Sequence, residues 1–178
     1  MALSTIDSTG LTAAGVTPTS LSQPLTLRTA VASTSGTSID FTSIPSWVKR
    51  ITVLFNGVSL SGTSLVQVQI GAGSVTTTGY LSYACYVINP PGNNNSTTGF
   101  LVDNASGASN LKYGTATICL VGSNAWVFSS ATGNSGSSAT GISGGALTLS
   151  GTLDRVRITT VNGTDTFDAG SINILYEG

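Results

Sequence analysis

The chain has 178 residues, of which 40% are hydrophobic and only 7% are charged, and its net charge is −1. This length suits one domain with a packed core, and the composition excludes disorder driven by charge as well as a long coiled coil. No apolar run approaches the roughly 20 residues of a membrane helix, and the few scattered basic residues give no electrostatic footprint for nucleic acid. We therefore expect neither membrane insertion nor a nucleic-acid partner.

The residue types that are missing narrow the chemistry further. The sequence contains no histidine, which excludes Ser–His triads, Cys–His dyads and ordinary zinc sites. Cys85 and Cys119 each lie in an apolar run, and we expect two free thiols in the core rather than a disulfide. No catalytic constellation, cofactor or metal site is expected. The first residues lack a basic segment followed by an apolar run, so no secretory signal is expected.

Residues 1–24 are rich in Ser, Thr, Gly and Ala and contain Pro18 and Pro24. Single apolar residues recur at irregular spacing, among them Leu3, Ile6 and Leu11. This spacing fits neither a helix face nor a strand face, so the segment cannot bury itself. A flexible tail is one interpretation. We favour an extended arm that becomes ordered against a partner, with those three residues as attachment points.

From Leu25 onward the pattern is that of short β-strands. Runs rich in Val, Ile, Thr and aromatic residues alternate with clusters of Gly, Asn, Ser and Pro. The predicted strands lie near residues 25–32, 37–42, 47–56, 64–71, 79–88, 98–103, 114–122, 124–131, 145–150, 153–161 and 169–177. Three of them alternate clearly. In the strand near 47–56, one face is predicted to hold Ile51, Val53 and Phe55 together with Trp47 and Lys49. In the strand near 64–71, Val66, Val68 and Ile70 are predicted to be buried, with Gln67 and Gln69 on a solvent-exposed face. In the strand near 169–177, Ile172, Ile174 and Tyr176 are predicted to share one face.

The connections carry turn signals of two kinds. Asn56-Gly57 and Asn162-Gly163 suit positive φ, and each is predicted to close a hairpin or a tight corner. Asn89 to Thr98 and Thr132 to Gly145 are polar stretches longer than the usual hairpin turn. They are predicted to form exposed, variable loops.

Two acidic groupings are candidate sites. Asp165 and Asp168 bracket a loop whose oxygens suit calcium, although the EF-hand spacing is absent; hydrogen-bonded loop capping is the interpretation we favour. Asp154, Arg155 and Arg157 suit either an anion clamp or a face of salt bridges, and we favour the salt bridges. A glycosidase-like pair of carboxylates is a further alternative without a motif to support it.

The two tryptophans, Trp47 and Trp126, each adjoin a valine. A buried core ring is the default expectation for both, because large aromatic side chains contribute most when they are buried. A platform on which a sugar ring stacks is the alternative.

Both ends of the β region are similar to a known family. The amino-terminal runs are LSQPLTL (residues 21–27), STSGTSIDF (33–41) and IPSWVKRITV (44–53), and the carboxyl-terminal run covers residues 149–174. They resemble the carboxyl-terminal β-domain of bacteriophage tail-fibre and related virion proteins. The middle, residues 71–148, is only loosely similar, as expected if it carries host-specific loops.

The resemblance implies a homotrimer whose amino-terminal arm attaches to other virion proteins and whose β-domain contacts a host cell-surface glycan. Assembly would take place in the bacterial host cytoplasm, and the finished protein would belong to the virion. The chain lacks the long shaft of typical fibres, which raises a capsid decoration or cement protein as an alternative location for the same layout. A glycan-degrading tailspike-like enzyme is a second alternative.

The sequence thus predicts an all-β chain, with an attachment arm at residues 1–24 and a jelly-roll-like antiparallel β-sandwich at residues 25–178. The predicted function is that of a non-enzymatic, short trimeric tail fibre. The candidate receptor contacts are Asn93, Asn94 and Asn95, in an exposed polar run, together with Tyr113.

Overall fold

The computed structural model describes residues 23–87, 91–108, 110–136 and 138–178. Within these residues the regular elements are all strands, so the predicted all-β class is confirmed. The strands are β1 (Thr26–Leu27), β2 (Val31–Ala32), β3 (Ser38–Phe41), β4 (Arg50–Leu60), β5 (Val66–Ala72), β6 (Ser74–Val75), β7 (Leu81–Val87), β8 (Gly92–Ser96), β9 (Phe100–Leu101), β10 (Lys112–Gly122), β11 (Ala125–Asn134), β12 (Ala139–Thr148), β13 (Arg155–Thr160) and β14 (Phe167–Glu177).

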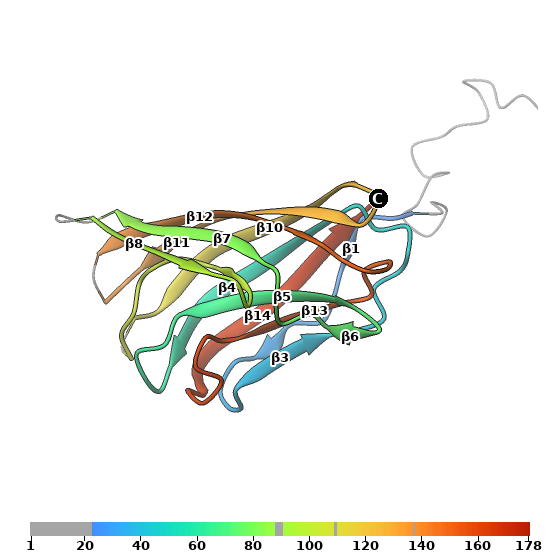
Figure 1. Ribbon diagram of the computed structural model, residues 1–178. Helices are drawn as coiled ribbons and strands as arrows, with labels where there is room; N and C mark the ends of the chain where they lie inside the picture. Colours follow the sequence, from blue (N-terminus) through green and yellow to red (C-terminus); the bar gives the residue numbers. More distant parts are fainter. Residues whose placement is uncertain (1–22, 88–90, 109, 137) are drawn as a thin grey trace, which may run out of the picture.

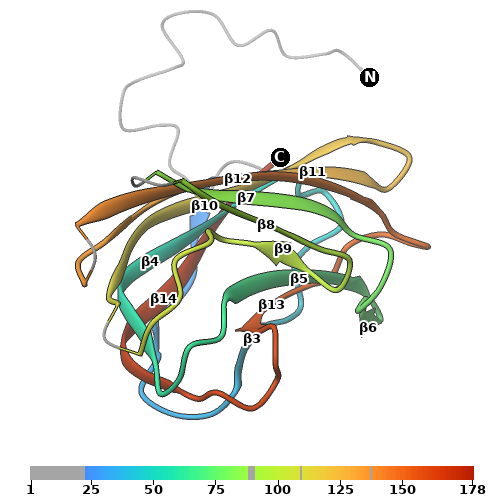
Figure 2. The same cartoon turned by 60° about the vertical axis from the view of Figure 1, so that its left-hand side comes forward.

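The strands form two sheets with antiparallel pairing. The nine-stranded sheet runs in the order β1-β14-β4-β10-β11-β12-β7-β8, and β2 also pairs with β14. The five-stranded sheet runs β3-β13-β5-β6, and β9 also pairs with β5. Figures 1 and 2 show the larger sheet curving over the smaller one. The core lies between these two layers, as in a sandwich.

Alternation along the strands decides which side chains enter the core. Ile51, Val53 and Phe55 of β4 are buried, as predicted, and so are the inward side chains of β14. Trp126 is buried within the core, as expected, whereas Trp47 is only partly buried against it, so the expectation of a buried ring holds for Trp126 alone.

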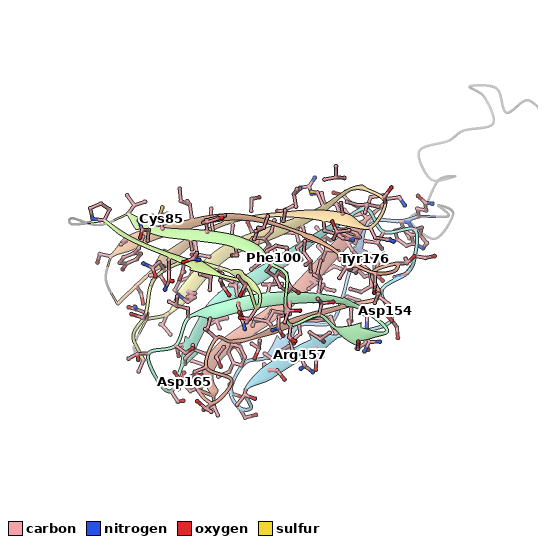
Figure 3. The ribbon with its side chains drawn as sticks, viewed as in Figure 1. Cys85, Phe100, Asp154, Arg157, Asp165 and Tyr176 are labelled. Carbon is pink, nitrogen blue, oxygen red and sulfur yellow. The ribbon has the colours of Figure 1, made fainter. Side chains whose placement is uncertain are left out.

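An aromatic cluster joins the two layers. Phe100 stacks on Phe128 with ring centroids 4.7 Å apart and planes 4° apart. The ring of Tyr80 meets Phe100 edge-on, with centroids also 4.7 Å apart. Phe100 belongs to the smaller sheet and Phe128 to the larger one, so these contacts join the two sheets. Figure 3 shows Phe100 between the two layers.

The predicted solvent-exposed face of β5 is wrong. Gln67 and Gln69 are only 3% and 5% exposed. The Gln69 side-chain amide donates to the Thr98 carbonyl over 2.8 Å, and the Thr98 hydroxyl donates to Gln67 Oε1 over 3.1 Å. A chain segment distant in sequence therefore covers these amides and satisfies their hydrogen bonds.

The two predicted long loops are also largely wrong. Strand β11 continues to Asn134 and β12 begins at Ala139, so the Thr132–Gly145 stretch is mostly a hairpin. Strand β8 lies inside the other stretch and pairs with β7. Backbone pairing overrides side-chain polarity here, because small polar residues are compatible with an exposed ladder.

The two Asn-Gly pairs behave differently. Gly163 has a φ of 69° and its N–H donates to the Thr160 carbonyl over 3.2 Å, which confirms a tight corner. Gly57 has a φ of 66° but lies inside β4, where the register of the β10 pairing shifts. The predicted reversal at Asn56-Gly57 is therefore wrong, and the pair forms a β-bulge.

The cysteine prediction is half right. Cys85 and Cys119 are free thiols, as expected. They are only partly buried and lie outside the hydrophobic core, so their predicted core placement is wrong. Their strand positions match those of exposed neighbours such as Tyr83 and Val121, which places both on the outer face of the larger sheet.

The predicted attachment residues Leu3, Ile6 and Leu11 lie outside the described residues. The arm at residues 1–24 and the jelly-roll topology stay predictions. None of the described elements is a helix capable of spanning a membrane.

Candidate functional site

Five adjacent strands of the nine-stranded sheet present an uncharged outer face. Strands β10, β11, β12, β7 and β8 contain one charged residue, Lys112, and its side chain is buried. We call the solvent-facing side of these five strands the outer sheet face. Its large exposed apolar side chains are those of Leu81, Tyr83, Val87, Tyr113, Val121, Val127 and Ile142. An apolar surface of this kind is typical of a binding surface.

A pocket of about 640 Å³ lies on the outer sheet face where β8, β7 and β12 run side by side. We call it the β8 pocket. It is lined by Tyr83, Ala84, Cys85, Asn93, Asn94, Asn95, Ile142, Ser143 and Gly144. In Figure 3, Cys85 lies in the upper layer, away from Phe100 between the sheets.

Strand register builds this pocket. Asn95 lies opposite Tyr83, and Asn93 lies opposite Cys85. On the other side, Tyr83 lies opposite Gly144, which has no side chain to fill the space beside the ring. The aromatic ring is thus flanked by open space on one side and by an amide on the other, and it is 63% exposed.

The amides of β8 are available to different degrees. Asn94 Oδ1 accepts a hydrogen bond from the N–H of Asn95 over 2.8 Å, which fixes that side chain locally. Within the described residues, the side chains of Asn93 and Asn95 make no hydrogen bond. Each therefore offers a carbonyl acceptor and an NH₂ donor to a ligand.

The structure brings the three predicted asparagines together, but it does not bring Tyr113 to them. Tyr113 is exposed on β10, and three strands separate β10 from β8. At about 4.8 Å per strand the two positions are roughly 19 Å apart. A contact role for Tyr113 stays a prediction, at a second position on the same face.

Sequence reasoning missed Tyr83, Cys85 and Ile142. In the sequence, Leu81 to Val87 resembles a strand buried on both faces, because apolar residues occupy both sets of alternate positions. The available signal was charge: residues 51–102 and 113–153 contain no charged residue at all. Such long uncharged stretches are unusual for strands with one face in solvent.

A second hollow of about 400 Å³ lies on the same face, between the Thr76–Leu81 segment and the β10–β11 turn. Trp126 lines it, and its buried indole N–H has no hydrogen-bond partner within the described residues. This ring is largely enclosed, so it offers a donor rather than a stacking surface.

The arginines of β13 are engaged by carboxylates. Arg157 binds Asp40 through two hydrogen bonds of 2.7 and 2.8 Å, and Arg155 binds Asp154 through two of 2.8 and 3.0 Å. Both pairs are partly exposed. This arrangement agrees with the predicted face of salt bridges. Because both guanidinium groups are already paired with carboxylates, neither is free to bind an anion as the alternative required.

The Asp165 carboxylate caps its loop. It accepts from the N–H of Ser64 and from the side-chain amide of Asn162, both over 2.8 Å. Asp168 accepts instead from the Ser59 hydroxyl. These contacts agree with the favoured capping interpretation, and the described residues contain no group of three acidic or cysteine ligands arranged for a metal ion.

These contacts predict a pH dependence of stability. The hydrogen bond from Asn162, and then that from Ser64, hold the pKa of Asp165 below its ordinary value of 3.8. A lowered folded-state pKa adds stability above pH 3.8, and this stability is lost as the pH falls through the folded-state value. Asp165→Asn should therefore unfold at lower urea concentration than the original chain at neutral pH, and the gap should close at acid pH. Urea midpoints measured from pH 7 down to pH 2 would show this, and a gap that stays constant over the range would contradict it.

Comparison with protein families, with curated protein sequences and with solved structures found no match to this chain.

Proposed function

We propose that the chain is a non-enzymatic virion structural protein of a bacteriophage, a short trimeric tail fibre that binds a neutral glycan of the host surface at the β8 pocket. The observation that carries this proposal is an uncharged hollow that combines the exposed Tyr83 ring with the side-chain amides of Asn93 and Asn95, which make no hydrogen bond within the described part of the chain. The phage assignment itself rests on the sequence resemblance.

The chemistry of the pocket suits a sugar. A tyrosine ring offers an apolar face to the C–H groups of a pyranose, while amides of asparagine donate to and accept from hydroxyls. Binding pockets combine such apolar walls with a few polar groups that fix orientation. Because no charged side chain lines the pocket, a neutral saccharide is favoured over an anionic one.

The proposed trimer would form near the amino-terminal edge of the larger sheet. Leu25, Leu27 and Val31 are exposed there, beside the point where residues 1–24 join the β region. Burial of these side chains between copies of the chain would remove apolar surface from water. The arm would then hold the trimer on the tail, among other virion proteins.

The test is binding of the full-length protein to an array of neutral bacterial polysaccharides, followed by titration of a positive glycan. Tyr83→Ala and the double variant Asn93→Ala/Asn95→Ala should each weaken binding by about tenfold or more, because each removes direct contacts of about 1–2 kcal/mol. Asn56→Ala is the matched control, since Asn56 is an exposed asparagine on β4, outside the pocket.

Unchanged affinity in both pocket variants would contradict the proposed site. If antibody labelling then placed the protein on the capsid, the decoration-protein alternative would replace the tail fibre. Release of oligosaccharide fragments during incubation would identify a degrading enzyme instead.

A further inference from the structure

A cluster of polar side chains is buried beneath the larger sheet, apart from the β8 pocket. Asp103 is 0% exposed, and Lys112 and Asn134 are each 3% exposed. Asp103 follows β9, Lys112 begins β10 and Asn134 ends β11. Three fully enclosed side chains of these types are costly unless each is paired.

The contacts among the three are direct. Lys112 Nζ lies 2.7 and 2.9 Å from the two carboxylate oxygens of Asp103, and 3.1 Å from Asn134 Oδ1. Asn134 Nδ2 lies 3.2 Å from Asp103 Oδ2. A single carboxylate therefore touches both the amine of the lysine and the amide nitrogen of the asparagine.

The fold holds this geometry in place. Lys112 and Asn134 are directly opposite each other in the β10–β11 ladder. Asp103 also accepts from the Thr132 hydroxyl over 2.7 Å and from the N–H of Ala105 over 2.9 Å, and Lys112 Nζ donates to the Ala105 carbonyl over 3.0 Å.

Strand β12 passes directly over the cluster and covers Asp103 at Gly141. A Cβ on Gly141 would overlap the Cβ of Asp103, so only glycine lets β12 pass this closely over the carboxylate. The three polar side chains are thus buried and covered by a strand that passes close to them.

We propose that Lys112 and Asn134 form an intramolecular isopeptide bond, with Asp103 carrying the proton. Lys112 Nζ is the nucleophile, Asn134 Cγ is the carbon attacked, and ammonia is the leaving group. The reaction happens once per chain and modifies the chain itself.

The atoms balance without another reactant. Asp103 takes a proton from the Lys112 ammonium through their hydrogen bond, which leaves a neutral amine. The amine forms the new N–C bond to Asn134 Cγ, and Asp103 then passes a proton to Asn134 Nδ2, so that the C–N bond of the side-chain amide breaks. The nitrogen of the attacking amine loses its second proton to the departing ammonia by way of the same carboxylate. The products are a secondary amide and NH₄⁺, and Asp103 is again a carboxylate.

Several features favour this reaction over a purely structural ion pair. A proton carrier must lie within about 2.6–3.2 Å of the groups that it serves, and Asp103 meets this condition on both sides. Fixing two reactants side by side is worth effective molarities of about 10⁵–10⁸ M when the approach is correct.

The test is peptide mapping of the full-length protein after unfolding and digestion with trypsin. Trypsin sites at Arg50, Lys112 and Arg155 should give peptides 51–112 and 113–155 from an unlinked chain. An acylated lysine is not cleaved, so the linked chain should give one peptide, 51–155, lighter than its sequence by one ammonia. Fragmentation should place the loss between Lys112 and Asn134.

A succinimide at Asn56-Gly57 would also lose ammonia from this region. It hydrolyses in mild alkali and leaves Lys112 cleavable, whereas the isopeptide bond survives and blocks cleavage. Separate peptides 51–112 and 113–155 of full mass in the original chain would overturn the proposal, and this result does not depend on any variant folding.

Variants assign the roles. Asn134→Ala and Asp103→Asn should each restore cleavage after Lys112 and the full peptide mass. Asn110→Ala is the matched control: this asparagine is buried nearby and bonds to the Ser106 carbonyl rather than to the cluster, so its peptide 51–155 should keep the ammonia loss. Persistence of the loss in Asn134→Ala would also overturn the proposal.

Discussion

Lys112→Met is expected to lower the free energy of unfolding by about 3–5 kcal/mol relative to Asn134→Ala, in which the isopeptide bond cannot form and Lys112 keeps its charge, because it leaves the buried Asp103 carboxylate without its cation. Asp103 would keep hydrogen bonds from Thr132, Asn134 and Ala105, but no positive charge would remain beside it. The measurement is equilibrium unfolding in urea, monitored by tryptophan fluorescence, at neutral pH.

Two comparisons separate the charge from the proposed covalent bond. Asn134→Ala cannot form the bond but retains the ion pair, so Lys112→Met should unfold at lower urea concentration than Asn134→Ala. Adding Asp103→Asn to Lys112→Met should recover part of the loss, since it removes the orphaned charge. Equal midpoints for Lys112→Met and Asn134→Ala would show that the ion pair contributes nothing.

Phe100→Ala is expected to lower the free energy of unfolding by about 3–5 kcal/mol. The side chain is fully buried and contacts the rings of both Tyr80 and Phe128. Its removal would open a cavity where the two sheets meet and break a stacked and an edge-on contact at once. Urea unfolding measures the loss.

Phe100→Leu is the matched control, because it keeps an apolar side chain in most of the space. It should lose clearly less stability than Phe100→Ala. Equal midpoints for the two variants would show that neither the volume of the Phe100 ring nor its stacking contacts stabilise the packing of the two sheets.

The strands with regular alternation could be predicted from the sequence because burial of one face leaves a local pattern. Ile172 and Ile174 are examples, since polar neighbours mark the opposite face. Gln67 and Gln69 could not be placed in this way, because the segment that covers them comes from about 30 residues further along the chain. Asn-Gly at position 56 correctly signalled positive φ, but that conformation serves a bulge as well as a reversal.

The candidate site was predictable only in part for the same reason. The run Asn93 to Asn95 stands out locally, whereas Tyr83 joins it through strand pairing that the local pattern does not encode. The pairing of Asp103 with Lys112 is likewise a property of the assembled sheets. Two charges within ten residues of each other give no sign that both will be buried.

The order of strands in the larger sheet has a mechanical consequence. Strand β1, next to the proposed arm, and β8, beside the proposed glycan pocket, lie at opposite edges of one sheet. A pulling force between the virion at one edge and a bound cell at the other would load each pair of hydrogen-bonded strands between them. The pair with the weakest hydrogen bonding would therefore separate first and set the force at which the attachment breaks. The proposed isopeptide bond between β10 and β11 would keep this pair of strands from separating under such a force.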